Sequence, residues 1–115
     1  MQVRTVGVIG AGQMGNGIAH VFALSGYDVV LNDISAEALE RAKGVIAKNL
    51  DRQLQREKIT AEERETAFGR ISTTTALPDL GPTDLVIEAA TEREAIKQKI
   101  FEDLVPHLKP HTILT

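Results

Sequence analysis

The sequence contains no cysteine among its 115 residues. This absence excludes a disulfide framework, a thiol nucleophile and a thiolate metal site, and no other metal-ligand pattern is recognisable. Long apolar runs are also missing, so no segment of the sequence is expected to cross a membrane. The net charge is −3, which gives no indication of binding to nucleic acid or to an acidic membrane surface.

The opening residues, "MQVRTVGVIG", enter a strand-like segment almost at once. We therefore expect no signal or transit peptide, and the predicted location is the cytoplasm. An apolar fraction of 43% is ordinary for a globular fold and too high for a disordered chain. The length predicts one domain, or a piece of one, over residues 1–115.

Apolar residues alternate between strand-like and helix-like spacing along the chain. In the first helix, Met14, Ile18, Val21 and Phe22 follow helical spacing, and Gly26 ends it. The predicted strands are residues 2–9, 27–33, 70–77, 83–90 and 112–115, and the predicted helices follow Gly12, Ser35, Thr60 and Thr91, the last two with capping boxes to Glu63 and Glu94.

This alternation predicts an α/β fold, a doubly wound parallel sheet with helices on both faces, of the Rossmann type. The expected strand order is 3-2-1-4-5, which places a switch point between the first and fourth strands. Ligands of such sheets bind at the carboxyl ends of the strands beside that point.

Three glycines follow the first strand in the pattern G-x-G-x-x-G. Gly10 would permit a tight turn, Gly12 would let a pyrophosphate approach the backbone, and Gly15 would let helix and strand pack closely. The amides of residues 12–15 would then face the phosphates from a helix N-terminus. Glycines that only make a turn are the alternative.

An acidic residue ends the second predicted strand, 18 residues after Gly15, where dinucleotide-binding folds bind the adenosine ribose. This residue is Asp33. Its carboxylate would accept hydrogen bonds from the ribose hydroxyls and repel a 2′-phosphate. The sequence therefore predicts NAD rather than NADP as the cofactor, and a solvated turn residue is the alternative.

The segment "VIGAGQMGNGIAHVFALSGYDVVLNDIS" resembles the NAD-binding start of the L-3-hydroxyacyl-CoA dehydrogenases, and within them the bacterial 3-hydroxybutyryl-CoA dehydrogenases. The segments "KNLDRQLQREKIT" and "DLVIEAATEREAIKQKIF" are similar to their later helices and fourth strand. The resemblance implies an oxidoreductase that interconverts 3-hydroxyacyl-CoA and 3-oxoacyl-CoA by hydride transfer to NAD.

The resemblance also implies site residues. Glu92 and Lys97 match positions that contact NAD near its nicotinamide half, although a carboxylate in a first helical turn and a solvated lysine are the alternatives. The cofactor-binding residues so implied are Gly10, Ala11, Gly12, Gln13, Met14, Gly15, Asp33, Glu92 and Lys97.

Arg52 and Arg56 lie four residues apart and so share one face of the long second helix. They match basic positions that meet the phosphates of coenzyme A in the family, a role that suits the planar guanidinium. Asp51 and Glu57 nearby support the alternative of a solvated helix face with mixed charges.

The family's catalytic histidine and its helpers lie beyond the fifth strand, as does the helical domain that forms the dimer. We therefore expect no catalytic residue in this chain, which would bind NAD without turning over, and a homo-oligomer in the full-length family. None of His20, His107 and His111 lies where the sheet would bind a ligand. The alternatives are a β-hydroxyacid dehydrogenase and a non-catalytic nucleotide-binding or structural module.

Overall fold

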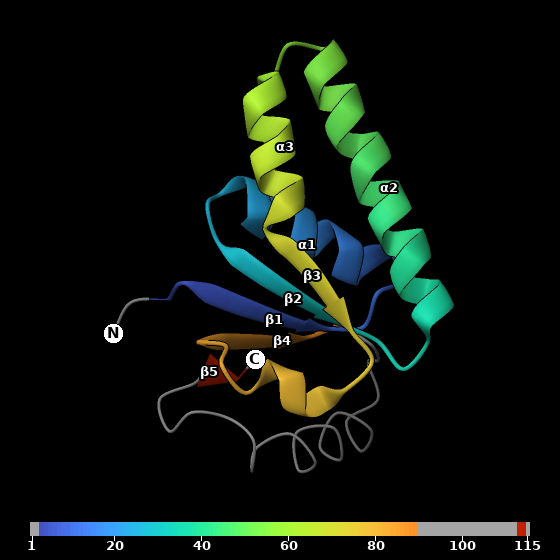
Figure 1. Ribbon diagram of the computed structural model, residues 1–115, viewed down its shortest axis with the longest axis vertical. Helices are drawn as coiled ribbons and strands as arrows, with labels where there is room; N and C mark the ends of the chain where they lie inside the picture. The colour runs from blue at the N-terminus through green and yellow to red at the C-terminus, as the bar shows by residue number, and fades with distance from the viewer. Residues whose placement is uncertain (1–2, 90–112, 115) are drawn as a thin grey trace.

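The computed structural model describes residues 3–89 and 113–114 of the chain. Strands and helices alternate as the sequence predicts, up to the end of the fourth strand (Figure 1). In chain order the elements are β1 (Thr5–Ile9), α1 (Gln13–Leu24), β2 (Asp28–Asn32), α2 (Ala36–Gln55), α3 (Ala61–Gly69), β3 (Ile71–Thr74), the 3₁₀ helix η1 (Leu77–Leu80), β4 (Leu85–Glu88) and β5 (Ile113–Leu114).

The five strands form one parallel sheet in the order β3-β2-β1-β4-β5. The predicted order and fold class are confirmed. β1 is central, and Ile9 at its carboxyl end lies beside Asn32 of β2 and Glu88 of β4. Because the chain reverses its direction of winding at β1, the switch point lies between β1 and β4, where the glycine-rich turn leaves the sheet.

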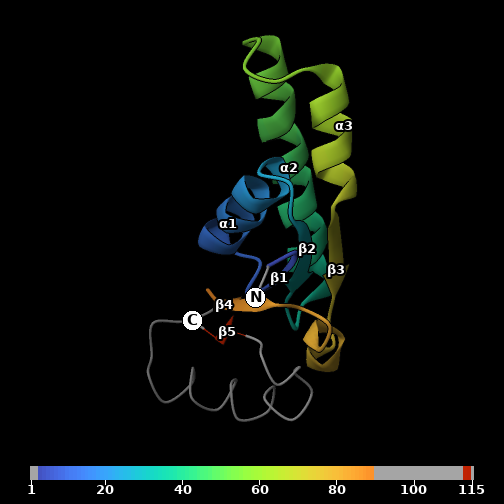
Figure 2. The same ribbon diagram turned by 90° about the vertical axis from the view of Figure 1, so that its left-hand side faces the viewer.

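Helices α1, α2 and α3 cover one side of the sheet (Figures 1 and 2). Val6 and Val8 of β1 are fully buried in the main core on that side. On the other side, Leu80 of η1 packs with Ile9 and Val86 in a smaller core. The predicted first strand is thus buried on both faces, as an internal strand of a parallel sheet should be.

The apolar residues at helical spacing in α1 do not all face the core. Ile18 and Phe22 pack against the main core, but Met14 and Val21 are 59% and 61% exposed. The fully buried residues of this helix are the small Gly15, Ala19 and Ala23. Small side chains let α1 lie close against the sheet, and this close approach turns the larger apolar residues partly or wholly outward. Apolar spacing alone does not separate these two faces, since both recur at helical intervals.

The second helix buries a stripe of apolar residues at helical spacing, Leu39, Ala42, Ile46 and Leu50. Its N-cap is Ser35, whose hydroxyl oxygen accepts a hydrogen bond from the Ala38 amide at 3.1 Å. The predicted capping box of Thr60 and Glu63 also forms at the start of α3. The sequence therefore predicts these two helix starts correctly.

Helix α2 ends in a Schellman motif, in which the Lys58 amide bonds to the Gln53 carbonyl and the Glu57 amide to the Leu54 carbonyl. Glu57 has φ = 59°, and it is the one non-glycine residue with positive φ in the described part of the chain. Glycine is the usual residue at this position because it has no Cβ to clash in the left-handed conformation.

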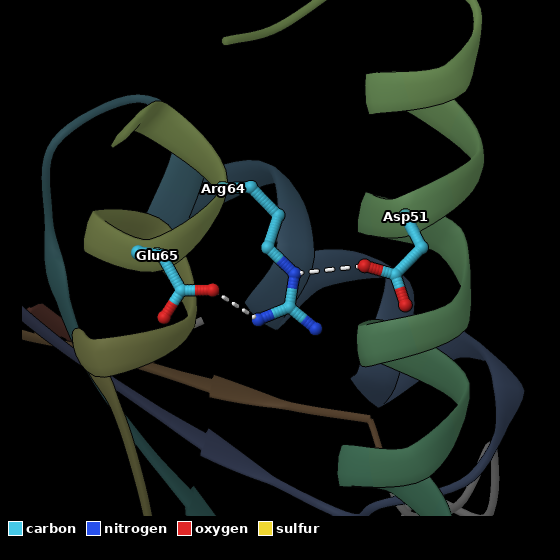
Figure 3. Close-up of polar contacts among 3 residues, drawn as sticks. All are labelled: Asp51, Arg64 and Glu65. Carbon is cyan, nitrogen blue, oxygen red and sulfur yellow. Dashed lines mark hydrogen bonds and ion pairs between the residues drawn. The ribbon is translucent and has the colours of Figure 1, made fainter. Parts of the chain in front are cut away.

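Arg64 of α3 joins the two antiparallel helices (Figure 3). Its Nε donates to Asp51 of α2 at 2.9 Å and its Nη1 donates to the neighbouring Glu65 at 2.9 Å. The hydrogen bond that Arg64 donates to Asp51 raises the pKa of Arg64 above its usual value. Arg64 and Lys43 also lie over the ring of Phe68, at 5.2 and 4.9 Å from its centroid.

The predicted third strand, residues 70–77, ends earlier in the structure, at Thr74. The following loop bends because the Thr74 hydroxyl donates to Asp79 at 2.6 Å and accepts from the Ala76 amide. The helix η1 then begins at Leu77 and was not predicted. The predicted capping box of Thr91 and the helix after it lie outside the described residues. No helix in the described part is both long and apolar enough to cross a membrane.

Candidate functional site

The turn between β1 and α1 depends on two of its glycines. Gly10 has φ = 102°, a conformation that L side chains rarely adopt, and its amide donates to the Asn32 carbonyl at 2.7 Å. A Cβ at Gly15 would lie 1.7 Å from the Gly10 carbonyl oxygen. The turn and the close packing of α1 therefore require glycine at both positions.

Gly12 has a different role because it faces open space. A Cβ at Gly12 would have no heavy atom within 4 Å. The residue is the N-cap of α1, where no side chain caps the helix and no acidic residue occupies the first turn. Gly12, Gln13 and Met14 are all exposed. The amides of this helix start are therefore accessible to an anion, which the helix dipole would favour.

Asp33 lies directly beyond β2 and beside this turn. Its Oδ2 accepts a hydrogen bond from the Ala11 amide at 2.9 Å, and its Oδ1 accepts one from the Ser35 amide at 2.9 Å. A carboxylate oxygen can accept two hydrogen bonds, so each oxygen keeps acceptor capacity for a further donor. The carboxylate is thus fixed in place and can still bind a pair of neighbouring hydroxyls.

The open helix start and the fixed carboxylate fit a dinucleotide. The first offers donors and room for a pyrophosphate, and the second offers acceptors for a ribose diol. The bonds from Ala11 and Ser35 to Asp33 were not predicted from the sequence. The bond from Ser35 could have been expected, since an aspartate side chain commonly accepts a hydrogen bond from the backbone amide two residues ahead.

A second candidate site lies between α1 and α2, away from the glycine-rich turn. A cavity of about 350 Å³ brings the predicted Arg52 and Arg56 together with Lys58 and His20. The His20 ring lies 2.9 Å from the Gln53 side-chain oxygen. No acidic residue lines this cavity, so its charge is positive. The sequence interpretation did not include Lys58 or His20 in this site.

A further cavity of about 400 Å³ lies along the same seam, nearer the glycine-rich turn. Gly12, Gln13 and Asn16 line it from the α1 side, and Arg41 and Val45 line it from α2. Arg41 was not predicted to take part in a site. Hollows thus lie at both ends of the α1–α2 seam, one beside the turn and one with the basic cluster.

The remaining predicted residues, Glu92 and Lys97, lie outside the described residues, as do His107 and His111. Residues 3–89 and 113–114 contain no group of three side chains that could hold a metal ion.

The NAD binding domain family of 3-hydroxyacyl-CoA dehydrogenase matches residues 5–115. The chain belongs to this family. Its glycine-rich turn and Asp33 are therefore parts of an NAD-binding domain, and the geometry of both fits that cofactor. The family assignment also sets aside the alternative of a β-hydroxyacid dehydrogenase.

Several relatives of this NAD-binding domain are named 3-hydroxybutyryl-CoA dehydrogenase. A 3-hydroxybutyryl-CoA dehydrogenase of Bradyrhizobium diazoefficiens is 52% identical over 97% of this chain and 38% of its own length. The crystal structure of a 3-hydroxybutyryl-CoA dehydrogenase from Escherichia coli has a TM-score of 0.96 at 46% identity, over 99% of this chain and 24% of that one. One from Ralstonia eutropha has a TM-score of 0.93 at 42% identity, over 98% and 40%. The chain thus spans well under half the length of these relatives.

Proposed function

We propose that this NAD-binding domain serves an oxidoreductase that interconverts 3-hydroxyacyl-CoA and 3-oxoacyl-CoA, with 3-hydroxybutyryl-CoA as the preferred substrate. The names of the relatives support this activity. The observation that carries the cofactor part is the fixed carboxylate of Asp33 beside the open helix start at Gly12. NAD, when bound, would accept the hydride that leaves the carbon bearing the 3-hydroxyl.

The residues of the turn would bind the cofactor through their backbone. Gly10 and Gly15 set the path of the chain, and the amides from Gly12 to Met14 donate to the phosphates. Asp33 accepts from the adenosine ribose and disfavours a 2′-phosphate by charge repulsion. Ala11 and Gln13 complete this loop, and Glu92 and Lys97 remain proposed contacts nearer the nicotinamide.

The basic cavity between α1 and α2 would bind the phosphates of the acyl-CoA substrate. Arg52 and Arg56 line it together, which favours a shared ligand over two separately solvated side chains. Lys58 adds a third positive charge. The absence of an acidic residue among the lining groups strengthens the attraction for an anion, because no carboxylate competes for the guanidinium groups.

We also propose that catalysis needs residues outside this chain. The His20 ring lies against Gln53 in the basic cavity. His20 lies in the second half of α1, away from the carboxyl end of β1 where the ligand would bind. In this proposal residues 1–115 form the dinucleotide-binding domain, and a further domain supplies the catalytic base and the contacts of a homodimer in the cytoplasm. The chain by itself then binds NADH and does not reduce acetoacetyl-CoA.

Fluorescence titration of the chain with NADH tests the cofactor site. Asp33→Ala should weaken binding by about tenfold or more, because it removes charge-assisted hydrogen bonds. Asp28→Ala is the matched control, since it removes an exposed carboxylate at the opposite end of the same strand. Equal affinity of the wild type for NADH and NADPH, or unchanged affinity of Asp33→Ala, would contradict the proposal.

Binding of adenosine 3′,5′-bisphosphate, a fragment of coenzyme A, tests the basic cavity. Arg52→Ala and Arg56→Ala should each weaken it, and the loss should shrink at high salt. Lys48→Ala is the control, because Lys48 is an exposed cation of the same helix that does not line the cavity. If the control weakens binding as much as the two variants do, the site is a diffuse charge effect.

A further inference from the structure

The basic cavity between α1 and α2 contains a histidine as well as its cations. This residue, His20, is partly buried and lines the cavity from α1. Its ring nitrogen Nε2 lies 2.9 Å from the side-chain oxygen of Gln53 on α2. An amide oxygen only accepts hydrogen bonds, so Nε2 carries a hydrogen and donates it to Gln53. This bond fixes the orientation of the ring at the wall of the cavity.

The charged side chains that line this cavity with the histidine are all cations from the end of α2, namely Arg52, Arg56 and Lys58. Asp51 precedes Arg52 in the sequence but does not line the cavity. Its carboxylate accepts a hydrogen bond from Arg64 of α3 at 2.9 Å instead (Figure 3). The second helix therefore gives the cavity positive charge without a compensating carboxylate.

The other elements packed against α1 bring no carboxylate to this cavity either, as far as the described residues extend. Helix α1 has no charged side chain besides His20, and β1 has none. Strand β2 has only Asp28, which is exposed at the amino end of the strand. In α3, Glu62 and Glu63 line a different cavity, together with Arg70, at the carboxyl end of α1. A bound anion would be the negatively charged partner that His20 lacks among the described residues.

Histidine is the side chain whose charge ordinarily changes between about pH 8 and pH 5. A neutral ring adds nothing to the attraction that the three cations exert on an anion, whereas a charged ring adds a fourth positive charge. A phosphate bound within about 4–6 Å favours the charged form of an imidazole. The added proton goes to Nδ1, because Nε2 already carries one, so the hydrogen bond to Gln53 is kept in both charge states.

We propose that His20 is a phosphate-binding residue of this cavity, and that its ring takes up a proton from solvent when the phosphates of the acyl-CoA bind. The inference deepens the proposed function and rests on it, because it takes the basic cavity as the phosphate site. The contribution of His20 to the affinity is fully present at low pH, where its ring is charged, and is lost as the pH rises. Acidification thus strengthens the part of the binding that His20 provides.

Isothermal titration calorimetry with adenosine 3′,5′-bisphosphate, between about pH 6 and pH 8, tests this role. The ligand loses part of its own charge toward the acidic end of this range, so variants are compared at equal pH. The wild type should bind about three- to tenfold more tightly than His20→Gln at the acidic end, and the two should bind equally at the basic end. Titrations in buffers of different ionisation enthalpy should show that the wild type takes up more protons on binding than His20→Gln does.

His20→Lys is the matched control, because it places a permanent charge at the same position. Its affinity relative to that of His20→Gln should not change with pH. Thermal unfolding of both variants checks that the fold is intact, as expected for a partly buried side chain. A His20→Lys chain with the same pH dependence as the wild type would contradict the proposal, since its lysine stays charged over this range.

Arg56→Ala separates this inference from the proposed function. It removes a permanent cation, so it should weaken binding at every pH and leave the proton uptake in place. If Arg56→Ala binds more weakly while His20→Gln keeps the affinity and the proton uptake of the wild type, the inference is overturned and the phosphate site stands. If neither variant changes the binding, the cavity is not a phosphate site, and the inference fails with that part of the proposed function.

Discussion

Three glycines near the start of α1 should respond differently to the same added methyl group. In Gly15→Ala the new Cβ would lie 1.7 Å from the Gly10 carbonyl oxygen and 2.8 Å from the Gly10 carbonyl carbon. The two backbones must move apart by more than about 1 Å to reach ordinary contact, in an interior packed too tightly to yield. The bond from the Gly10 amide to the Asn32 carbonyl opposes that movement.

Overpacking a core commonly costs about 1–3 kcal/mol, and a clash between two backbone segments belongs at or above the upper end. We therefore expect Gly15→Ala to lower the free energy of unfolding by about 3 kcal/mol or more. The melting temperature should fall by more than about 10 °C. Circular dichroism during heating measures both.

Gly12→Ala and Gly17→Ala complete the comparison, because a Cβ at either position meets nothing within 4 Å. Gly12→Ala should unfold within a few degrees of the wild type but bind NADH at least about tenfold more weakly, since its methyl group occupies the approach of the pyrophosphate. Gly17→Ala, inside the helix, should be more stable by about 0.5–1 kcal/mol and bind NADH normally. A Gly12→Ala chain with wild-type affinity, or a Gly15→Ala chain with wild-type stability, would refute this reasoning.

Two further predictions concern the α2–α3 pair. Glu57→Gly should raise the free energy of unfolding, measured in urea, by about 0.5–1 kcal/mol, because glycine removes the strain of the left-handed backbone and only part of that gain is lost to the greater freedom of the unfolded chain. Glu57→Ala keeps the strain and should show no such gain. Arg64→Gln should lower the melting temperature in low salt, and the difference should narrow near about 1 M salt, where exposed charges are screened. The pKa of Arg64 is raised in the folded chain, so its charge contributes to the free energy of unfolding. This contribution is fully present below the pKa of Arg64 in the unfolded chain, and it is lost only as the pH rises through the pKa of the folded chain. A dependence of that difference on pH between about 6 and 9 would contradict this account of Arg64.

The strand order could be predicted because the alternation of strands and helices along the chain is typical of a doubly wound parallel sheet. The glycine-rich turn could be predicted because it depends on residues close together in the sequence. Gly10, Gly12 and Gly15 lie between an apolar strand and a helical repeat, and Asp33 follows the next strand at the expected distance. The same holds for the helix caps at Ser35 and Thr60, where the hydroxyl and its amide are three residues apart.

Features that depend on packing between distant segments could not be predicted. The buried face of α1 is decided by how closely Ala19 and Ala23 approach the sheet, and Met14 has the same helical spacing as a core residue would. The cavity that joins His20 to Arg52 forms only when α1 lies beside α2. The left-handed residue Glu57 also gave no signal, since a glutamate favours continuing a helix rather than ending one.

The two hydrogen bonds that Asp33 accepts also affect the protein before a nucleotide binds. One carboxylate ties the turn after β1 to the start of α2, so the segments that would surround a nucleotide are already joined before it arrives. Little ordering of the backbone is then left for the binding step, which lowers the entropic cost of association. Substitution of this aspartate should accordingly loosen both loops in the free chain, and faster amide hydrogen exchange at Ala11 and Ser35 would reveal it without any ligand present.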